Sequence, residues 1–379
     1  MPVSRRRFLA TAAVGTAAAV IIEFPALDAA GRTMPAAHAA QEASAAAAPI
    51  ILSNNENAYG PLPSMAASMR DALTVSNRYP DSQYDAFVEA VAKHHAVRRD
   101  EVIAGNGSTE ILRIAVDAFT GPQRSLVMAA PTFEAAAFYA KRNSVQVVPV
   151  PLTSSFEHDL DAMAAAARNG GGLVYICNPN NPTATLTGRS RLEAFMKALP
   201  ETVYVVVDEA YHDFAVGSPQ YVSFLDQRVD DPRLIVARTF SKVYGIAGLR
   251  IGYGIAQKDT IERMRPHQLF DNLNMVAVQA AVTGMADVNG VRSAAARIAA
   301  DRAEFMKQAS ARGLNPMPSY TNFVMMDSPL PTAQAIDFFK QRGIAIGRDF
   351  HYGQRVRISL GKPEEMTAFW RAWDRMNQA

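Results

Sequence analysis

Short apolar runs alternate with longer amphipathic stretches through the middle of the chain, from about residue 85 to residue 260. The run Val203–Val207 is apolar throughout, which is typical of a strand that helices cover on both faces. The intervening stretches are long enough to form crossover helices. We therefore predict an α/β fold with a mostly parallel, doubly wound sheet. The predicted strands are Ser125–Met128, Val145–Val150, Leu173–Cys177, Val203–Val207, Leu234–Ala237 and Arg250–Ile255, and the predicted helices are Thr109–Phe119, Phe133–Lys141, Leu160–Arg168 and Arg189–Leu199.

The last hundred residues have a different pattern. An alanine-rich stretch from Val276 to Arg312 carries charges at helical spacing, and we expect it to form one long connecting helix. A smaller α+β module is predicted to follow. Its expected strands are Asn322–Met326, Ile344–Ile346 and Val356–Leu360, and its expected helices are Ala333–Arg342 and Glu364–Met376.

The first forty residues have the pattern of a twin-arginine export signal. Arg5, Arg6 and Arg7 precede a weakly apolar stretch, Ala10–Ile22, and Ala37-His38-Ala39 is a small-x-small cleavage signal. The apolar stretch is shorter than the ~20 residues that a membrane span needs, so we expect contact with the membrane only during export and a periplasmic location. The alternative is an alanine-rich extension with a chance arginine cluster.

These patterns divide the chain into four parts. They are the export signal (residues 1–40), a leader and N-terminal arm (41–84), a large domain (85–275), and a connecting helix with a small C-terminal domain (276–379).

Composition excludes several classes of protein. The chain has 379 residues, of which 49% are hydrophobic and 20% charged, so it can bury a large core. Its formal net charge of +2 argues against nonspecific binding of nucleic acid. Cys177 is the single cysteine and no Cys/His cluster has zinc-ligand spacing, so we expect neither a disulfide scaffold nor a metal site.

The segment Arg238–Tyr253 is the most informative part of the sequence for chemistry. Lys242 lies among small hydroxyl residues directly after a predicted buried strand, and Arg250 follows it among glycines. A lysine in this setting suits Schiff-base formation beside a bound phosphate, for which the hydroxyls and the arginine supply donors. A Ser-Lys pair alone is common on protein surfaces, so the neighbouring residues carry the interpretation.

Three further segments lie at predicted strand-to-helix transitions. Asp208 ends the Val203–Val207 strand, where it could hold a pyridine nitrogen protonated or only cap the next helix. Asn181 lies in a loop with two prolines that either aims an amide at a ligand or forms a plain turn. The segment Gly105–Glu110 precedes a predicted helix, whose free N–H groups could bind phosphate, although an ordinary cap would explain it.

Together and in this order, the four segments resemble the fold-type I, class I/II aminotransferases that use pyridoxal phosphate, and within them the histidinol-phosphate aminotransferase subgroup. The resemblance extends from Leu52–Pro61 through Arg78-Tyr79-Pro80-Asp81 and Leu269–Asn274 to Val356–Gly361. It implies a large domain with a mostly parallel sheet of the seven-stranded type and a smaller α+β C-terminal domain. It also implies an active homodimer.

The resemblance implies a role for each matching residue. Lys242 would hold the cofactor covalently and move the proton during catalysis. Arg357 would bind the acidic group of the substrate, with Arg348 and Tyr59 near it. Tyr79 would reach the cofactor phosphate of the other subunit. The implied cofactor-binding residues are Tyr79, Ser108, Thr109, Phe133, Asn181, Asp208, Tyr211, Thr239, Ser241, Lys242 and Arg250.

The chain departs from the family pattern in three ways. Ala184 stands where the family usually has glycine, and the loop between Arg348 and Arg357 is shorter than in histidinol-phosphate enzymes. An export signal would also separate the enzyme from a cytoplasmic phosphorylated intermediate. A free amino acid, aromatic or imidazole-bearing, is therefore as good a candidate donor as histidinol phosphate, with a 2-oxo acid as acceptor. Racemisation, decarboxylation or elimination on the same scaffold, or a noncatalytic cofactor-binding protein, are the alternatives.

Overall fold

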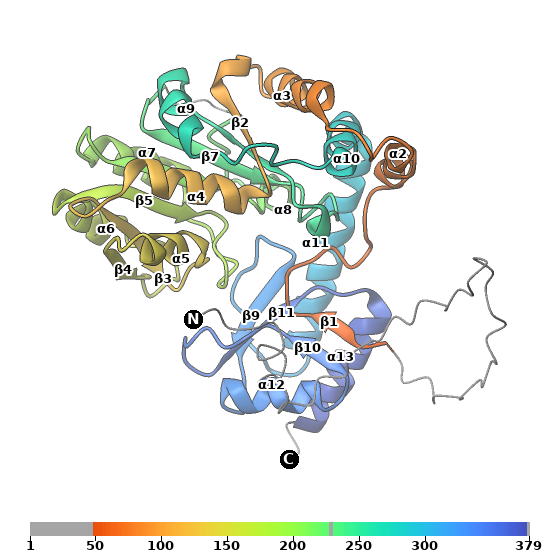
Figure 1. Cartoon of the computed structure of the whole chain (residues 1–379). Helices are drawn as coiled ribbons and strands as arrows, with labels where there is room; N and C mark the ends of the chain where they lie inside the picture. The colour runs from red at the N-terminus through yellow and green to blue at the C-terminus, as the bar shows by residue number, and fades with distance from the viewer. Residues whose placement is uncertain (1–47, 227–229, 377–379) are drawn as a thin grey trace, which may run out of the picture. The chain divides into compact units, whose positions relative to one another are not determined.

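A computed structural model describes residues 48–226 and 230–376, and these residues contain a large sheet and a smaller module (Figure 1). Within them the large sheet has seven strands in the order β2-β8-β7-β6-β5-β3-β4. All neighbouring strands pair in parallel except β8, which is antiparallel to β2 and β7. The predicted mostly parallel sheet is confirmed. The strands are β2 (Val102–Gly105), β3 (Ser125–Ala130), β4 (Val147–Pro151), β5 (Gly171–Cys177), β6 (Tyr204–Asp208), β7 (Leu234–Thr239) and β8 (Gly252–Ile255).

Helices cover both faces of the sheet. Successive strand residues point to opposite faces, so neighbouring residues of one strand pack against different helices. Leu126 faces a core formed with α4 (Ser108–Phe119), α5 (Ala135–Arg142) and α9 (Lys258–Met264). The next residue, Val127, faces a core formed with α6 (Leu160–Arg168) and α7 (Arg189–Ala198). The central strands β5, β6 and β7 are therefore buried on both faces, which explains their continuous apolar runs, whereas Pro149 and Pro151 of the edge strand β4 are exposed.

The sequence missed or misplaced several elements around the sheet. Strand β2 was not predicted because it has only four residues before the glycine-rich loop. The predicted strand Arg250–Ile255 begins only at Gly252, since Arg250 adopts a left-handed conformation (φ 57°). Also unpredicted were α2 (Pro63–Leu73), α3 (Asp81–His94), the short α8 (His212–Ala215) and the 3₁₀ turns η1 (Arg99–Glu101), η2 (Ala247–Leu249) and η3 (Arg265–His267).

The prediction of a single connecting helix from Val276 to Arg312 is wrong. The stretch forms two helices, α10 (Met275–Ala286) and α11 (Val288–Ser310). Asp287 separates them, because its side chain caps α11 by accepting a hydrogen bond from the Gly290 backbone N–H at 2.9 Å. The carboxylate also accepts a hydrogen bond from Ser64 at 2.6 Å, which ties the break to α2.

The smaller module combines residues from both ends of the described chain. Strands β9 (Phe323–Asp327) and β11 (Arg355–Ser359) pair antiparallel, and β1 (Ile50–Leu52) pairs in parallel with β10 (Ile344–Ile346). They pack with α11, α12 (Thr332–Lys340) and α13 (Pro363–Met376) around a core that includes Phe339, Phe369 and Trp373. Among the described residues, no helix is both long and apolar enough to cross a membrane.

Candidate active site

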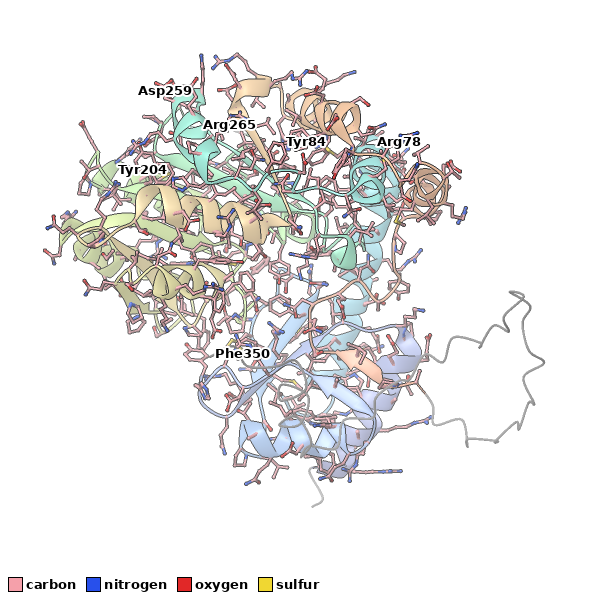
Figure 2. The ribbon with its side chains drawn as sticks, viewed as in Figure 1. Arg78, Tyr84, Tyr204, Asp259, Arg265 and Phe350 are labelled. Carbon is pink, nitrogen blue, oxygen red and sulfur yellow. The ribbon has the colours of Figure 1, made fainter. Side chains whose placement is uncertain are left out.

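A cavity of about 410 Å³ lies where the carboxyl ends of β5, β6 and β7 meet the start of α4 and the small module. This is the edge at which open α/β sheets bind ligands. Phe350, which is labelled on the small module in Figure 2, is one of the residues that line it. The cavity brings together most of the site residues that the sequence predicts, namely Ser108, Thr109, Phe133, Asn181, Asp208, Tyr211, Thr239, Ser241, Lys242, Arg250, Arg348 and Arg357.

Lys242 presents an amine of lowered basicity to the cavity. Its Nζ lies 3.2 Å from the Asn55 carbonyl oxygen and 5.4 Å from the centre of the Tyr211 ring. Burial, together with the positive charge of Arg357, lowers the pKa of Lys242 to about 8, although Glu56 and Asp208 oppose the shift. A useful fraction of the amine is therefore uncharged, and able to act as a nucleophile, close to neutral pH.

Asp208, the last residue of β6, provides a buried carboxylate on the cavity wall. Tyr175 donates a hydrogen bond to its Oδ2 at 2.9 Å, and the Ala210 backbone N–H donates to its Oδ1 at 3.1 Å. Burial raises the pKa of Asp208 to about 6, while these hydrogen bonds and Lys242 act in the opposite direction. Asp208 is thus ionised at neutral pH and placed to stabilise a positive charge in the cavity.

The start of α4 offers hydrogen-bond donors to an anion. Its N-cap, Gly107, provides no side-chain cap, and the Glu110 N–H already donates to the Gly107 carbonyl oxygen at 3.2 Å, so the Ser108 and Thr109 N–H groups are the ones that remain to bind a ligand. A Cβ at Gly107 would collide with the Arg250 guanidinium, so glycine lets the arginine lie against the loop. Arg250 also donates to Ser241 Oγ at 3.4 Å, and Thr239 donates to the same oxygen at 2.9 Å.

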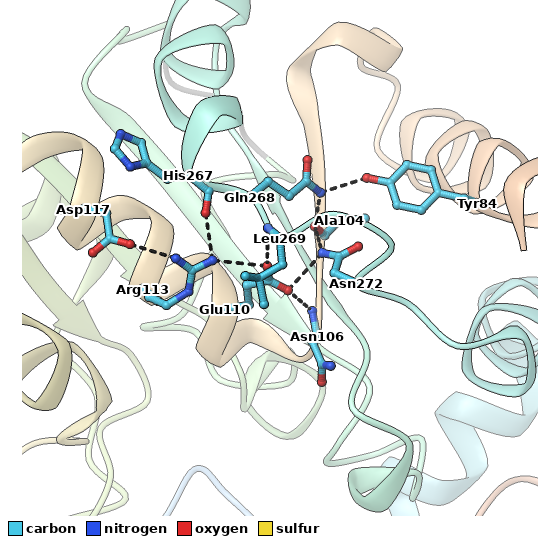
Figure 3. Close-up of polar contacts among 10 residues, drawn as sticks. All are labelled: Tyr84, Ala104, Asn106, Glu110, Arg113, Asp117, His267, Gln268, Leu269 and Asn272. Carbon is cyan, nitrogen blue, oxygen red and sulfur yellow. Dashed lines mark hydrogen bonds and ion pairs between the residues drawn. The ribbon is translucent and has the colours of Figure 1, made fainter. Parts of the chain in front are cut away.

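A polar network that the sequence did not reveal fixes the loop before α4 (Figure 3). The Glu110 carboxylate accepts hydrogen bonds from the Asn106 backbone N–H at 2.6 Å, the Leu269 backbone N–H at 3.0 Å and the Asn272 amide at 2.9 Å. Arg113 adds an ion pair to Glu110 at 3.3 Å. The network joins the segment Leu269–Asn274 to the predicted anion site. The only sequence signal for this network was a glutamate, Glu110, in the first turn of a predicted helix.

A second arginine, Arg357, lies buried on the opposite wall, in β11. Its guanidinium donates to Asn181 Oδ1 at 2.6 Å and to the Ser53 carbonyl oxygen. Its Nε is buried without a hydrogen-bond partner, and no carboxylate pairs with it among the residues that the structure describes. Burial, with repulsion from Arg348, lowers the pKa of Arg357 to about 10, so it stays charged at neutral pH. Such a group favours an anionic ligand.

Arg348 lines the same cavity but already has an acidic partner. Its guanidinium pairs with Glu134 Oε2 at 2.7 Å, and both side chains are more than half exposed, at 56% and 60%. Phe350 lies between the two arginines, with its ring centre 4.6 Å from the Arg348 guanidinium carbon and 4.7 Å from that of Arg357. The pair links the small module to the residue before α5. Glu134 was not predicted as a site residue, and nothing near it in the sequence marks it.

Two of the predicted residues lie outside this cavity. Tyr59 donates to Asp301 Oδ2 at 3.0 Å and stacks under the Arg297 guanidinium, so the structure does not bring it to Arg357 within this chain. Tyr79 is 76% exposed, on the segment between α2 and α3. The structure describes one chain, so the predicted contact of Tyr79 with the cofactor of another subunit stays a prediction.

The alanine that departs from the family pattern has an unusual conformation. Ala184 is buried with φ 66°, a region that costs a residue with a Cβ roughly 1–2 kcal/mol. Its N–H donates to the Asn180 carbonyl oxygen at 2.8 Å, and its own carbonyl oxygen accepts from the Tyr320 N–H at 2.9 Å. The loop that carries Asn181 is therefore held by both flanking contacts despite the missing glycine.

A buried ion pair behind the cavity also escaped the sequence analysis. Arg238 pairs with Glu209 Oε2 at 2.8 Å, and Ser223 donates to the same oxygen at 2.7 Å. The network holds the segment after Asp208 against β7, and removing one partner of such a pair is expected to destabilise the fold by about 3–5 kcal/mol. An arginine within an apolar strand was the signal for it.

The arrangement fits pyridoxal phosphate, the cofactor that the sequence predicts. The uncapped start of α4, with Arg250 free of any carboxylate among the described residues, provides a cradle for a phosphate. Lys242 provides the amine, and Asp208 provides the carboxylate for a ring nitrogen. Phe133 and Tyr211 line the cavity beside them, and about 410 Å³ is within the usual range for a small-molecule site.

Comparisons with known proteins agree with this geometry. The sequence profile described as aminotransferase class I and II matches residues 47–372. A histidinol-phosphate aminotransferase of Shouchella clausii is 34% identical over 84% of this chain and 87% of its own. An aromatic amino acid aminotransferase of Nocardia farcinica is 32% identical over 85% of this chain and 90% of its own. The crystal structure of a histidinol-phosphate aminotransferase from Sinorhizobium meliloti, in complex with pyridoxal-5′-phosphate, superposes with a TM-score of 0.81 at 28% identity, covering 87% of this chain and 91% of that one.

Proposed function

Because the chain belongs to the class I and II aminotransferases and is a pyridoxal-phosphate-dependent enzyme, we propose that its amino donor is an α-amino acid whose carboxylate binds Arg357. The amino group then passes to a 2-oxo acid in a second half-reaction. One observation carries the proposed donor. Arg357 is a buried, charged guanidinium on the cavity wall without a carboxylate partner among the described residues, and its planar donors suit a carboxylate.

The residues of the cavity divide the work of the reaction. When bound, pyridoxal phosphate supplies an aldehyde carbon that combines with amines and a ring that withdraws electrons from the donor's Cα. Among the residues that line the cavity, Ser108, Thr109, Ser241 and Arg250 would hold the phosphate, and Asn181 and Tyr211 would hold the ring oxygen. Held in this way, the cofactor would be within reach of Lys242, and Arg357 would be left to the donor.

Two side chains handle charge and protons. With the donor and pyridoxal phosphate in the cavity, the Lys242 amine would serve as the base that takes the proton from the donor's Cα, and as the acid that returns it to the cofactor carbon on the other side of the donor nitrogen. Its pKa of about 8 suits both directions of that transfer near neutral pH. Asp208 would keep a proton on the ring nitrogen, so that the ring could stabilise the negative charge that develops when the Cα proton leaves.

The pair between Arg348 and Glu134 favours a singly charged acidic group over a phosphate dianion. Arg357 faces the cavity with its full positive charge, whereas the Glu134 carboxylate, 2.7 Å from Arg348, offsets the charge of that second arginine. A carboxylate needs only one bidentate guanidinium. A phosphate carries about two charges and would meet repulsion from Glu134.

Histidinol phosphate is the second candidate donor. Two observations favour it: Arg348 and Arg357 line the same cavity, and the relative from Shouchella clausii is named for this substrate. Both candidate donors are amines that carry an anionic group, and in both cases that group would bind Arg357. The anionic group is a carboxylate in the amino acid and a phosphate in histidinol phosphate.

Visible absorption spectra of the purified holoenzyme test the proposal. Each L-amino acid, and separately histidinol phosphate, is added alone, and the band of the lysine-bound cofactor is followed before and after addition of 2-oxoglutarate. We expect an amino acid to remove the band and 2-oxoglutarate to restore it with formation of glutamate. A response to histidinol phosphate alone would favour the second candidate, and no response to any donor would contradict both.

We also propose that the active unit is a homodimer in which Tyr79 completes the site of the other subunit. The exposure of Tyr79, with Leu269 and Phe270 at 55% and 93%, supports an apolar contact surface near the start of α4. Tyr79→Phe and Lys242→Ala subunits are expected to be weakly active or inactive alone. Mixed and refolded together, they should regain activity, because each heterodimer holds one site with both residues intact. No recovery in demonstrated heterodimers would contradict the shared site.

The third proposal is export to the periplasm. It rests on Arg5, Arg6 and the following apolar stretch, which lie outside the residues that the structure describes. Changing both arginines to lysine is expected to keep the full-length protein in the cytoplasm, as measured by fractionation and by loss of N-terminal processing. Unchanged export of the double variant would refute the twin-arginine route, and a second variant with Arg32→Lys serves as the control for altered charge.

A further inference from the structure

A tyrosine on the neighbouring strand holds the carboxylate of Asp208. Strands β5 and β6 pair in parallel, with Tyr175 opposite Val206 and Cys177 opposite Asp208. Residues two apart on a strand share a face, so Tyr175 and Asp208 lie on the same side of the sheet. The tyrosine hydroxyl reaches one register step along that face and donates to Asp208 Oδ2 at 2.9 Å.

This contact is shielded from water. Tyr175 is fully buried, with 0% of its surface exposed, and Asp208 is 2% exposed. Among the described residues, the other hydrogen bond to the carboxylate comes from the Ala210 backbone N–H, on the opposite oxygen. The two donors therefore fix the plane of the carboxylate, and Tyr175 is the one that a side-chain substitution can remove.

We propose that Tyr175 is a positioning residue for transamination, whose hydroxyl aims the Asp208 carboxylate into the cavity and keeps it ionised. The inference rests on the proposed pairing of Asp208 with the cofactor's ring nitrogen. Tyr175 itself does not line the cavity, so it acts through Asp208 and touches neither cofactor nor donor.

The charged and titratable groups around Asp208 show why the hydroxyl matters. Burial, the largest cause, and the Glu209 charge raise the pKa of Asp208, whereas Tyr175, the Ala210 N–H and Lys242 lower it, and the net result is a pKa of about 6. The Cys177 thiol and the Tyr211 phenol also lie near the carboxylate. Burial raises the pKa of both groups above their ordinary values, so both stay neutral. Without the Tyr175 hydroxyl, burial dominates and the carboxylate is protonated at a higher pH.

Tyr175→Phe is the direct test, and Tyr221→Phe is its matched control. Tyr221 is also buried, and its hydroxyl lies 3.0 Å from His212 Nδ1 rather than near Asp208. In cofactor-free protein labelled with ¹³C at aspartate carboxyls, the Asp208 resonance is assigned with Asp208→Asn and titrated. We expect its pKa to be higher by about one unit or more in Tyr175→Phe and unchanged in the control.

The holoenzyme gives a second readout. At pH 7 the turnover number of Tyr175→Phe is expected to fall by about 10- to 100-fold, as for loss of one hydrogen bond to a charged group. The acid limb of its pH profile should move upward with the carboxyl titration, while KM for the donor changes little. If Tyr175 had only a structural role, the turnover number of Tyr175→Phe would fall without any movement of the acid limb of the pH profile.

An unchanged Asp208 titration in Tyr175→Phe would overturn the inference, whatever the donor proves to be, because that measurement needs no turnover. If the variant does not fold, the wild-type chain grown with 3-fluorotyrosine replaces it. The more acidic hydroxyl strengthens the hydrogen bond and should move the Asp208 titration downward. No downward movement would then contradict the proposed role.

Discussion

Lys242→Ala is expected to lower the turnover number by at least about 10³-fold, because in the proposed reaction this one side chain provides both the covalent attachment of the cofactor and the proton transfer at the donor's Cα. No second amine lines the cavity among the described residues, so no other side chain can take over either task. The purified variant should also lack the absorption band of the lysine-bound cofactor. Stopped-flow half-reactions with the best donor measure the loss.

The same substitution should make the cofactor-free protein more stable at pH 7. The folded-state pKa of Lys242 is about 8, below the ordinary value of 10.5, so the folded state binds fewer protons between these pH values and gains stability as pH rises through them. At pH 7 the ammonium destabilises the fold, and removing it should raise the unfolding free energy by roughly 1–3 kcal/mol. Chemical denaturation at pH 7 and pH 10 checks the sign, since the gain should shrink at the higher pH.

Lys242→Arg is the control for charge. Its guanidinium stays protonated and cannot serve as nucleophile or base, so it should be as inactive as the alanine variant but no more stable at pH 7 than the wild type. Retention of more than a tenth of wild-type turnover in either variant would refute the assigned role of Lys242.

The sheet and the centre of the site were predictable because their signals are local. Val203–Val207 is apolar without interruption, so a buried strand could be placed, and Asp208 then falls at its carboxyl end. The segment from Arg238 to Tyr253 carries Lys242, Ser241 and Arg250 within one turn region, where sequence distance and spatial distance agree. Such residues can be assigned from one stretch of sequence.

The residues that the sequence missed act through contacts between distant segments. Glu134 meets Arg348 only because the small module lies against the start of α5, and more than two hundred residues separate them. Tyr175 reads as an ordinary strand residue until the register of β5 and β6 places its hydroxyl beside Asp208. The break at Asp287 was missed for a related reason, because alanine-rich spacing continues across it and only the cap shows the new helix.

Arg357→Gln is expected to lower kcat/KM for amino acid donors by about 10²- to 10³-fold, the usual effect of removing one partner from a buried charge-assisted hydrogen-bond pair. The cofactor should still bind, since the residues proposed to hold its phosphate, its aldehyde carbon and its ring nitrogen are other residues that line the cavity. Absorption spectra of the variant verify cofactor content, and steady-state kinetics with the best donor measure the loss. Arg357→Lys should recover only part of the activity, because an ammonium cannot match the bidentate geometry.

Glu134→Gln distinguishes the contribution of Arg348 to donor choice from that of Arg357, in the same kinetic assay. Neutralising Glu134 frees Arg348 to pair with a second negative charge, so kcat/KM for histidinol phosphate should rise several-fold while that for amino acids stays within about twofold. The effect is modest because both partners are exposed and screened by solvent. If Arg357→Gln left kcat/KM for every donor unchanged, Arg357 would not be the anion-binding group. If Glu134→Gln left the donor ratio unchanged, Glu134 would not govern the choice between carboxylate and phosphate.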